Sequence, residues 1–230
     1  MRWRLVQELA GGDRRVRELV ALLGEPQSLV SYHLRQLRDA GLVASRRSSH
    51  DARDTYYSLD LAGCSAALSS AAAAVHPGLA RTPDGPADRA ASRRVLFVCT
   101  GNSGRSPMAQ ALLADRAGPR VQVASAGTHP KPLHPDAVAV MRDRYRIDIS
   151  GHRPVHVASV AGQRFDCIIS LCDKAREACP EFAGTPGRAH WSLPDPASGE
   201  GGLAGYAAFE RVATELDARI QFLLPGLAVP

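Results

Sequence analysis

The chain has 230 residues, of which 45% are hydrophobic and 22% charged, a globular composition sufficient for one large domain or two modest ones. The formal net charge of +5 is a mild basic bias, compatible with nucleic-acid binding without indicating it. No segment has the length of a membrane span, and the N-terminus lacks the apolar run of a signal peptide. Five cysteines, an odd number, favour catalytic or redox use over a structural disulfide set, and we therefore expect a cytoplasmic protein.

The first 75 residues predict a small helical domain. Apolar side chains recur at helical spacing in three places, which indicates helices around residues 5–9, 16–23 and 28–40. Two strands follow, separated by an arginine-rich polar tip, at residues 42–45 and 55–59. Helix, turn, helix and basic hairpin form the layout of a winged helix-turn-helix domain.

The outward face of the third helix and the hairpin arginines are the candidate DNA contacts. In this layout the third helix enters the major groove, while the hairpin arginines meet phosphates, which position the protein without reading sequence. We expect the DNA-binding residues to be Gln27, Ser28, Ser31, Tyr32, Arg35, Arg46 and Arg47. A winged helix that makes only protein contacts is the alternative.

The run from Gln27 to Val43 resembles the DNA-binding segment of the ArsR/SmtB family of metal- and metalloid-responsive repressors. The resemblance implies a homodimer, formed through the N-terminal domain, that binds operator DNA and releases it when a metal or metalloid binds. The second helix has no cysteine, so the cysteine-pair sensor common in that family is absent there. Cys64, in a candidate dimer helix at 61–68, is a lone thiol, and a sensor would need more sulfur ligands.

Residues 76–93 predict a linker. The segment is rich in proline, glycine and aspartate and has no apolar period. We therefore expect a DNA-binding domain over 1–75 and a separate domain over 94–230.

The second domain alternates strands with helices. Apolar runs indicate strands at residues 94–98, 121–127, 165–171 and 188–193. Helical spacing indicates helices at residues 107–116, 135–143 and 205–223. This alternation predicts an α/β fold in three layers, with a parallel sheet covered by helices on both faces. Ligands of such sheets bind at the carboxyl ends of the strands.

The segment from Cys99 to Ser106, between the first of these strands and a helix, predicts an anion site. Its glycines permit a tight turn whose backbone N–H groups can point inward at the positive end of the helix dipole. The same field favours the thiolate of Cys99, to which Ser106 can donate its hydroxyl. Arg105 can direct two donors onto a tetrahedral oxyanion. We expect the oxyanion-binding residues to be Thr100, Gly101, Asn102, Ser103, Gly104 and Arg105.

Two further cysteines and an aspartate extend this chemistry. Cys172 and Cys179 follow the third strand, and the six residues between them can bring them together as a loop or an unravelled helix. The pair lacks the partners of a metal site and fits thiol–disulfide exchange, with two unrelated cysteines as the alternative. Asp195 lies between two prolines, where a carboxylic acid near the anion site can protonate a leaving oxygen. An ordinary turn aspartate is the alternative.

Together these residues resemble the low-molecular-weight tyrosine phosphatase fold and, more narrowly, the thioredoxin-coupled arsenate reductases built on it. The resemblance implies that the loop binds arsenate, that Cys99 attacks arsenic and that Asp195 protonates the departing hydroxyl. Cys172 and Cys179 then pass the oxidation to an external thioredoxin-like reductant, with no metal and no organic cofactor. Gly104 stands where many of these relatives carry a second loop cysteine.

The sequence therefore predicts an arsenate reductase fused to an ArsR-like regulator. The catalytic residues expected are Cys99, Arg105, Ser106, Cys172, Cys179 and Asp195. Two alternatives remain: a low-molecular-weight phosphatase fused to a DNA-binding domain, and a non-catalytic repressor that senses oxyanions. The segment after Asp195 offers no aromatic side chain for phosphotyrosine, which disfavours the phosphatase.

Overall fold

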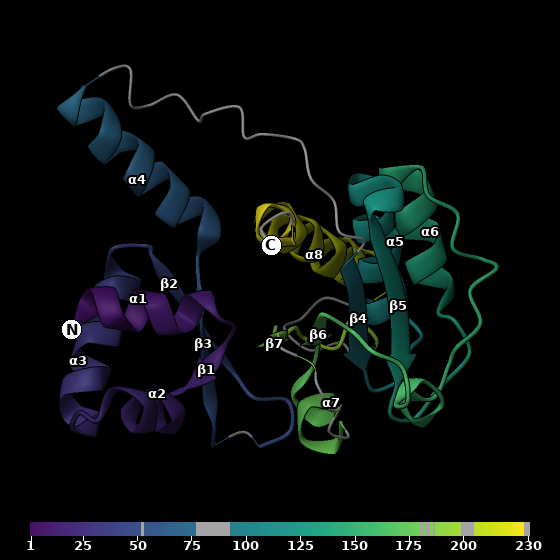
Figure 1. Cartoon of the computed structure of the whole chain (residues 1–230), viewed down its shortest axis with the longest axis horizontal. Coiled ribbons are helices and arrows are strands. Elements are labelled where there is room, and N and C mark those ends of the chain that lie inside the picture. Colours follow the sequence, from purple (N-terminus) through teal and green to yellow (C-terminus); the bar gives the residue numbers. More distant parts are fainter. Residues whose placement is uncertain are drawn as a thin grey trace. The chain divides into compact units, whose positions relative to one another are not determined.

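A computed structural model describes residues 1–51, 53–76, 93–179, 182, 185, 187–198 and 205–227. The chain forms two compact units, which we describe separately (Figure 1). Apart from its two end residues, the predicted linker over 76–93 lies outside the described residues.

The first unit is a small helical domain with a three-stranded antiparallel sheet in the order β1-β3-β2. Its elements are α1 (Arg2–Ala10), β1 (Arg14–Arg15), α2 (Val16–Leu23), α3 (Gln27–Asp39), β2 (Val43–Arg47), β3 (Thr55–Leu59) and α4 (Leu61–Val75). The three predicted helices and both predicted strands are confirmed. The short strand β1 was not predicted, because two arginines carry no apolar alternation, and it forms by pairing with Tyr56 and Tyr57 of β3.

The core of this unit follows the helical spacing in the sequence. The inward face of α3 is buried as predicted, with Val30, Leu34 and Leu37 at most 4% exposed. Leu5 of α1 and Leu19 of α2 complete the centre of the cluster.

Helix α4 differs from the others, because none of its residues is buried. Asp60 caps its start by accepting a hydrogen bond from the Gly63 backbone N–H at 2.8 Å. A Cβ on Gly63 would lie within 2.2 Å of the Gly41 carbonyl, so only glycine allows this close approach. Beyond that contact the helix presents Leu68 and Val75 to solvent.

The second unit contains a four-stranded parallel sheet in the order β5-β4-β6-β7. Its elements are β4 (Arg93–Cys99), α5 (Arg105–Ala117), β5 (Val121–Gly127), α6 (Pro135–Tyr145), β6 (Cys167–Ser170), α7 (Asp173–Ala178), β7 (Gly187–His190) and α8 (Tyr206–Leu227). Helices α5, α6 and α8 pack against one another, and α7 contacts β4 and β6. The predicted α/β class is therefore confirmed.

Most element boundaries in this unit differ from the predictions by one to four residues, and three differences bear on the site. The fourth strand ends at His190 rather than at residue 193, because the Leu193 N–H donates back to the Trp191 carbonyl and not to β6. Helix α5 begins at Arg105, two residues before Pro107, so the arginine and Ser106 form its first turn. The segment between Cys172 and Cys179 is not a loop but a short helix, α7.

The sheet register determines which residues meet at its carboxyl edge. Strands β4 and β6 are neighbours, and Val98 pairs with Ser170. The Leu171 backbone N–H donates to the Val98 carbonyl at 2.7 Å. Cys99 and Cys172 therefore leave adjacent strands at the same end of the sheet.

Candidate active site

The loop after β4 surrounds the sulfur of Cys99 with hydrogen-bond donors. The backbone N–H of Asn102 donates to the sulfur at 3.2 Å, and the Ser106 hydroxyl lies 3.0 Å from it. The side-chain amide of Asn102 donates to the same hydroxyl oxygen at 2.9 Å, and the hydroxyl also lies within donating distance of the Ala126 carbonyl, at 3.5 Å. Cys99 is 2% exposed. The buried sulfur therefore lies beside the N-terminus of α5, where backbone N–H groups are available to an anion.

Asn102 holds the loop in shape. Its φ of 45° is in the left-handed region, which few non-glycine residues adopt. The side chain secures this conformation from the buried side: its amide also donates to the Ser125 hydroxyl, and its carbonyl oxygen accepts from the Val155 backbone and from His152. Asn102, predicted to bind the oxyanion, therefore offers its backbone N–H to the site and uses its side chain to position the loop.

Arg105 is buried and aimed by backbone carbonyls. Its guanidinium donates to the carbonyl oxygens of Leu193 and Pro194 at 3.2 and 3.4 Å and lies 3.5 Å from the Asp195 carboxylate. Burial opposes its charge, but the nearby sulfurs of Cys172 and Cys99 raise the pKa of Arg105 above its ordinary value. The guanidinium remains protonated and faces the mouth of the loop.

Cys172 lies next to this loop. Its sulfur is 3.2 Å from the hydroxyl of Thr100, the residue immediately after Cys99, and the cysteine is 1% exposed. Cys99, Arg105, Cys172 and Asp195 line one pocket. The structure thus brings together four of the six residues that the sequence predicts to be catalytic, with Ser106 in contact with Cys99 beneath them.

The other two cysteines of this unit lie apart from that pocket. Cys179 ends α7, so it is separated from Cys172 by the length of the helix. Burial raises the pKa of its thiol, partly opposed by the positive charge of Arg188. Cys167, at the start of β6, has a pKa raised to about 11 by burial and by Asp166, as suits a packed, unreactive thiol.

An aromatic side chain also reaches the pocket, from α8. Phe209 stacks on the ring of His134 with centroids 4.4 Å apart, and a Cβ on Gly104 would lie 2.9 Å from its Cε1 atom. The ring is 1% exposed, so it packs against the loop and offers no open surface to a substrate. No local pattern predicts this contact, because Phe209 appears in the sequence as one more apolar residue of a helix.

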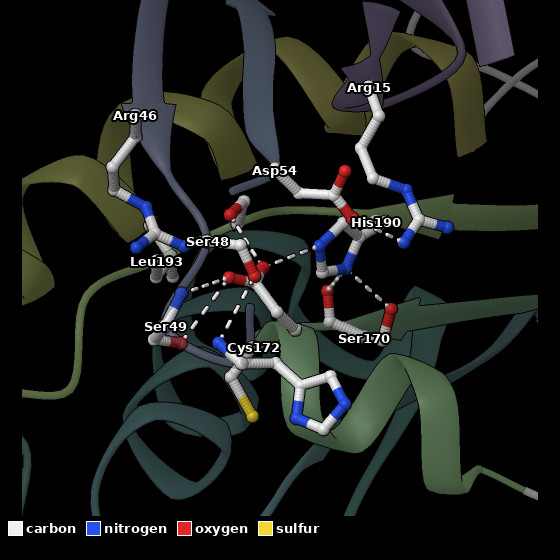
Figure 2. A network of polar contacts seen from close by, with 12 residues as sticks. Arg15, Arg46, Ser48, Ser49, Asp54, Ser170, Cys172, His190 and Leu193 are labelled. Atoms are coloured by element: carbon white, nitrogen blue, oxygen red, sulfur yellow. Dashed lines mark hydrogen bonds and ion pairs between the residues drawn. The ribbon is translucent and has the colours of Figure 1, made fainter. Parts of the chain in front are cut away.

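A buried carboxylate follows Cys172 directly. Asp173 accepts hydrogen bonds from the Ser192 hydroxyl at 2.6 Å and from Nε2 of His190 at 3.1 Å. The other ring nitrogen of His190 lies 2.8 Å from the Ser170 hydroxyl, a contact visible in Figure 2. The residues on both sides of Leu171 and Cys172 are thereby tied to the end of β7. Single-residue polar positions of this kind carry no periodic signal, and the sequence analysis missed them.

Comparison with known families agrees with this geometry. Residues 94–229 match the model of the low molecular weight phosphotyrosine protein phosphatases. The chain belongs to this family. Residues 1–45 match the model of bacterial regulatory proteins of the arsR family, so the phosphatase-family unit is joined to an ArsR-type helix-turn-helix.

Individual relatives of the phosphatase-family unit are named arsenate reductase. The chain is 35% identical over 128 residues to the arsenate reductase of Halalkalibacterium halodurans, covering 55% of this chain and 91% of that protein. It is 36% identical over 129 residues to the arsenate reductase of Brevibacillus brevis, covering 56% and 92%. A solved structure of an arsenate reductase in the phosphate binding state has a TM-score of 0.53 and 28% identity, over 59% of this chain and 99% of that one.

The ArsR-type unit places most of its predicted DNA contacts on the surface. Five of them are exposed: Gln27, Ser28, Tyr32, Arg35 and Arg47. Ser31 is half-buried in α3, and Arg46 donates to the Arg47 carbonyl at 2.8 Å. In this unit Cys64 lies 3.4 Å from the Leu42 carbonyl, and burial raises the pKa of its thiol.

Among the described residues, no group of three or more His, Cys, Asp or Glu side chains comes together at metal-binding distance. None of the described helices has the length and apolar character needed to cross a bilayer.

Proposed function

We propose that the phosphatase-family unit reduces arsenate to arsenite, that Cys99, Cys172 and Cys179 relay the electrons, and that a thioredoxin-type dithiol protein supplies them. The observation that carries the proposal is the contact of Cys172 with Thr100 beside Cys99. A phosphatase needs a single nucleophilic cysteine, whereas a reductase needs a second thiol within reach of the first. The names of the relatives favour the same substrate.

The first steps occur in the loop. Backbone N–H groups and Arg105 bind arsenate, and the Cys99 thiolate attacks arsenic. Asp195, at the mouth of the pocket, protonates the departing hydroxyl, which leaves as water. The product of this step is a Cys99–arsenate thioester-like adduct in which arsenic is still pentavalent.

The electrons move in the second stage. The Cys172 thiolate attacks the sulfur of Cys99 and forms a Cys99–Cys172 disulfide, while the sulfur–arsenic bond breaks and its electron pair leaves with arsenic as arsenite. Cys179 then attacks Cys172, which forms the Cys172–Cys179 disulfide and releases the Cys99 thiolate. The external dithiol reduces that disulfide, so two electrons pass for each arsenate.

Helix α7 keeps Cys172 and Cys179 too far apart for a disulfide. Its flanking residues Cys172 and Cys179 are seven positions apart, which corresponds to about 10 Å along an α-helix. A disulfide requires Cα atoms about 4.4–6.8 Å apart. At least one turn of α7 must therefore unwind before the second disulfide forms.

The decisive experiment compares two activities of one variant. Cys172→Ser should abolish arsenate-dependent NADPH oxidation coupled through thioredoxin and thioredoxin reductase, while hydrolysis of an aryl phosphate, which needs only Cys99, Arg105 and Asp195, persists. Cys167→Ser is the matched control and should retain both. If the Cys172 variant still turns over arsenate, the relay is wrong; if the wild-type chain hydrolyses aryl phosphate but never reduces arsenate, it is a phosphatase. If the wild-type chain reduces only one arsenate per molecule and then stops, it is an oxyanion sensor.

For the ArsR-type unit we propose an operator-binding homodimer formed through α4. The supporting observation is that this apolar helix buries none of its residues within one chain and exposes Leu68 and Val75. A gel-shift assay on the gene's own upstream DNA, with and without arsenite, tests both binding and release. Leu68→Glu should give a monomer by sedimentation and lose the shift; a variant that stays dimeric would contradict the proposed interface.

A further inference from the structure

Both lysines of the chain lie at the mouth of the anion pocket. The sequence has 28 lysines and arginines, of which Lys131 and Lys174 are the only lysines. They come from different elements, the loop after β5 and the first turn of α7, yet they line the same pocket as Cys99 and Arg105. Every other cation of fixed charge in this chain is an arginine, so the choice of lysine at these two places calls for a physical reason.

The two ammonium groups have no partner among the residues that the structure describes. Lys131 is fixed at its backbone, where its N–H donates to the Gly101 carbonyl at 2.9 Å, and its stem extends along that glycine. Both side chains are exposed. Within the described part of the chain, neither ammonium forms an ion pair or a hydrogen bond. Arg105 differs, because two carbonyls and Asp195 hold it.

This division matches the properties of the two residue types. Arginine offers a planar fork that fits an oxyanion in one orientation, which suits the fixed Arg105. Lysine is a compact, hydrated point charge on a flexible stem, which attracts an anion without imposing a geometry. Charges at the rim of a cleft raise the local concentration of an oppositely charged ligand, an effect that salt suppresses.

We propose that Lys131 and Lys174 form an anion-capturing pair that determines the affinity of the pocket for free inorganic tetrahedral oxyanions; its kinetic consequences rest on the proposed arsenate reduction. The pair lies at the mouth, so it attracts the bound oxyanion and the transition state about equally. Such uniform binding lowers KM and leaves kcat unchanged. Arsenous acid is uncharged near neutral pH, so the same lysines do not retain the product.

The test uses the full chain and four variants: Lys131→Gln, Lys174→Gln, the double variant, and the charge-conserving Lys131→Arg/Lys174→Arg. At low ionic strength we expect KM for arsenate to rise about threefold for each single variant and about tenfold for the double variant, with kcat within about twofold of wild type. The difference should shrink in about 1 M salt, where the Debye length falls to about 3 Å. The arginine variant keeps both charges, so its KM should lie closer to the wild-type value than that of the double glutamine variant. Arg164→Gln, an exposed site outside the pocket, is the matched control.

A second measurement separates this inference from the proposed reaction. Inorganic phosphate binding to the reduced chain, followed by calorimetry, needs no turnover, and its Kd should rise in parallel with the arsenate KM. If the lysine variants weaken phosphate binding but the chain does not reduce arsenate, the inference stands and the proposed function fails. If arsenate is reduced while both KM and the phosphate Kd stay at wild-type values in the double variant, the inference is overturned. A fall in kcat at constant KM, or wild-type protein that binds no phosphate, overturns it as well.

Discussion

The hydroxyl of Thr100 lies 3.2 Å from the sulfur of Cys172, although the two residues are 72 positions apart in the chain. Thr100 follows Cys99 directly, so this contact measures how closely the second thiol approaches the loop of the first. It exists because β4 and β6 are adjacent parallel strands that end together. One hydrogen bond of this kind contributes about 1 kcal/mol.

Removing that hydroxyl should affect the transfer of oxidation more than the first chemical step. Thr100→Val keeps the backbone donor of the loop and the side-chain shape but cannot hold the Cys172 sulfur. We expect arsenate turnover to fall about fivefold to tenfold, as about 1 kcal/mol requires, with aryl phosphate hydrolysis changed less than about twofold. Both rates are measured on the same preparation. An equal loss of both activities would mean that Thr100 serves the loop itself.

The rate of the second disulfide should depend on pH through Cys179. Burial raises the pKa of this thiol above its ordinary value, so only a small fraction is thiolate at neutral pH. We expect the rate at which Cys172–Cys179 forms after arsenate addition to rise by up to about tenfold per pH unit over neutral and mildly alkaline pH, until the raised pKa is passed. Acid quenching, alkylation and mass spectrometry give this rate. Arg188→Gln removes the opposing positive charge and should slow the step at pH 7; a flat pH profile would show that deprotonation of Cys179 does not limit it.

Gly104 should not tolerate a side chain while Phe209 is present. A Cβ there would lie 2.9 Å from the Phe209 ring, which is itself fixed by stacking on His134. Gly104→Ala should lower the free energy of unfolding by about 1–3 kcal/mol and reduce both activities, because the loop must shift. Gly151→Ala, with no atom within 4 Å of the new Cβ, is the control. Adding Phe209→Leu should restore part of the loss, and no recovery would mean that backbone conformation, rather than the ring, excludes alanine.

The hydrogen bond from Ser192 to the buried carboxylate of Asp173 should contribute to the stability of the fold. The Ser192 hydroxyl donates to the Asp173 carboxylate at 2.6 Å, and both residues are nearly inaccessible to solvent. Ser192→Ala leaves the charged acceptor with one donor fewer and should cost about 1.5–3 kcal/mol in urea unfolding. Ser159→Ala, which loses an exposed hydroxyl bonded to a backbone carbonyl, should cost less than about 1 kcal/mol. Equal costs for the two variants would contradict the importance of the buried carboxylate.

DNA affinity of the ArsR-type unit should show the signature of phosphate contacts at Arg47. This residue is exposed in β2. Arg47→Ala should weaken binding to operator and random DNA by similar factors and reduce the slope of log K against log salt by about one. Tyr32→Ala, on the exposed face of α3, should instead weaken operator binding more than random binding. Fluorescence anisotropy over a range of salt concentrations measures the affinity of each variant for operator and for random DNA. An unchanged salt slope for Arg47→Ala would exclude a contact of Arg47 with phosphate.

The sequence predicted the parts of the fold that local rules determine. The loop from Cys99 to Ser106 was predictable because its glycines, its cysteine and the helix that follows are contiguous. The alternation of strands and helices likewise predicted a parallel sheet with its ligand site at the carboxyl ends of the strands. That Cys172 comes to lie beside Thr100 is explained by the structure, because β4 and β6 are adjacent strands that end together; the sequence analysis linked Cys99 to Cys172 only through the resemblance.

The remaining features depend on three-dimensional contacts that have no local pattern. Helix α7 is six residues long, too short for a hydrophobic period, and packing against β4 and β6 stabilises it. The pairing of Phe209 with Gly104 joins two elements distant in the chain, as does the bond between Asp173 and His190. Exposed residues such as Lys131 and Lys174 carry no burial pattern at all, so only their shared position at the pocket reveals them.

The helix between Cys172 and Cys179 links the oxidation state of the two cysteines to the conformation of the backbone. Because α7 spans more length than a disulfide allows, the proposed relay requires the oxidised and reduced proteins to differ in backbone outline and not only in two hydrogen atoms. A reductant that recognises the unwound segment would bind the oxidised protein in preference to the reduced one, even if both expose similar amounts of sulfur. A partner protein could then distinguish the oxidised from the reduced state by the conformation of this segment alone.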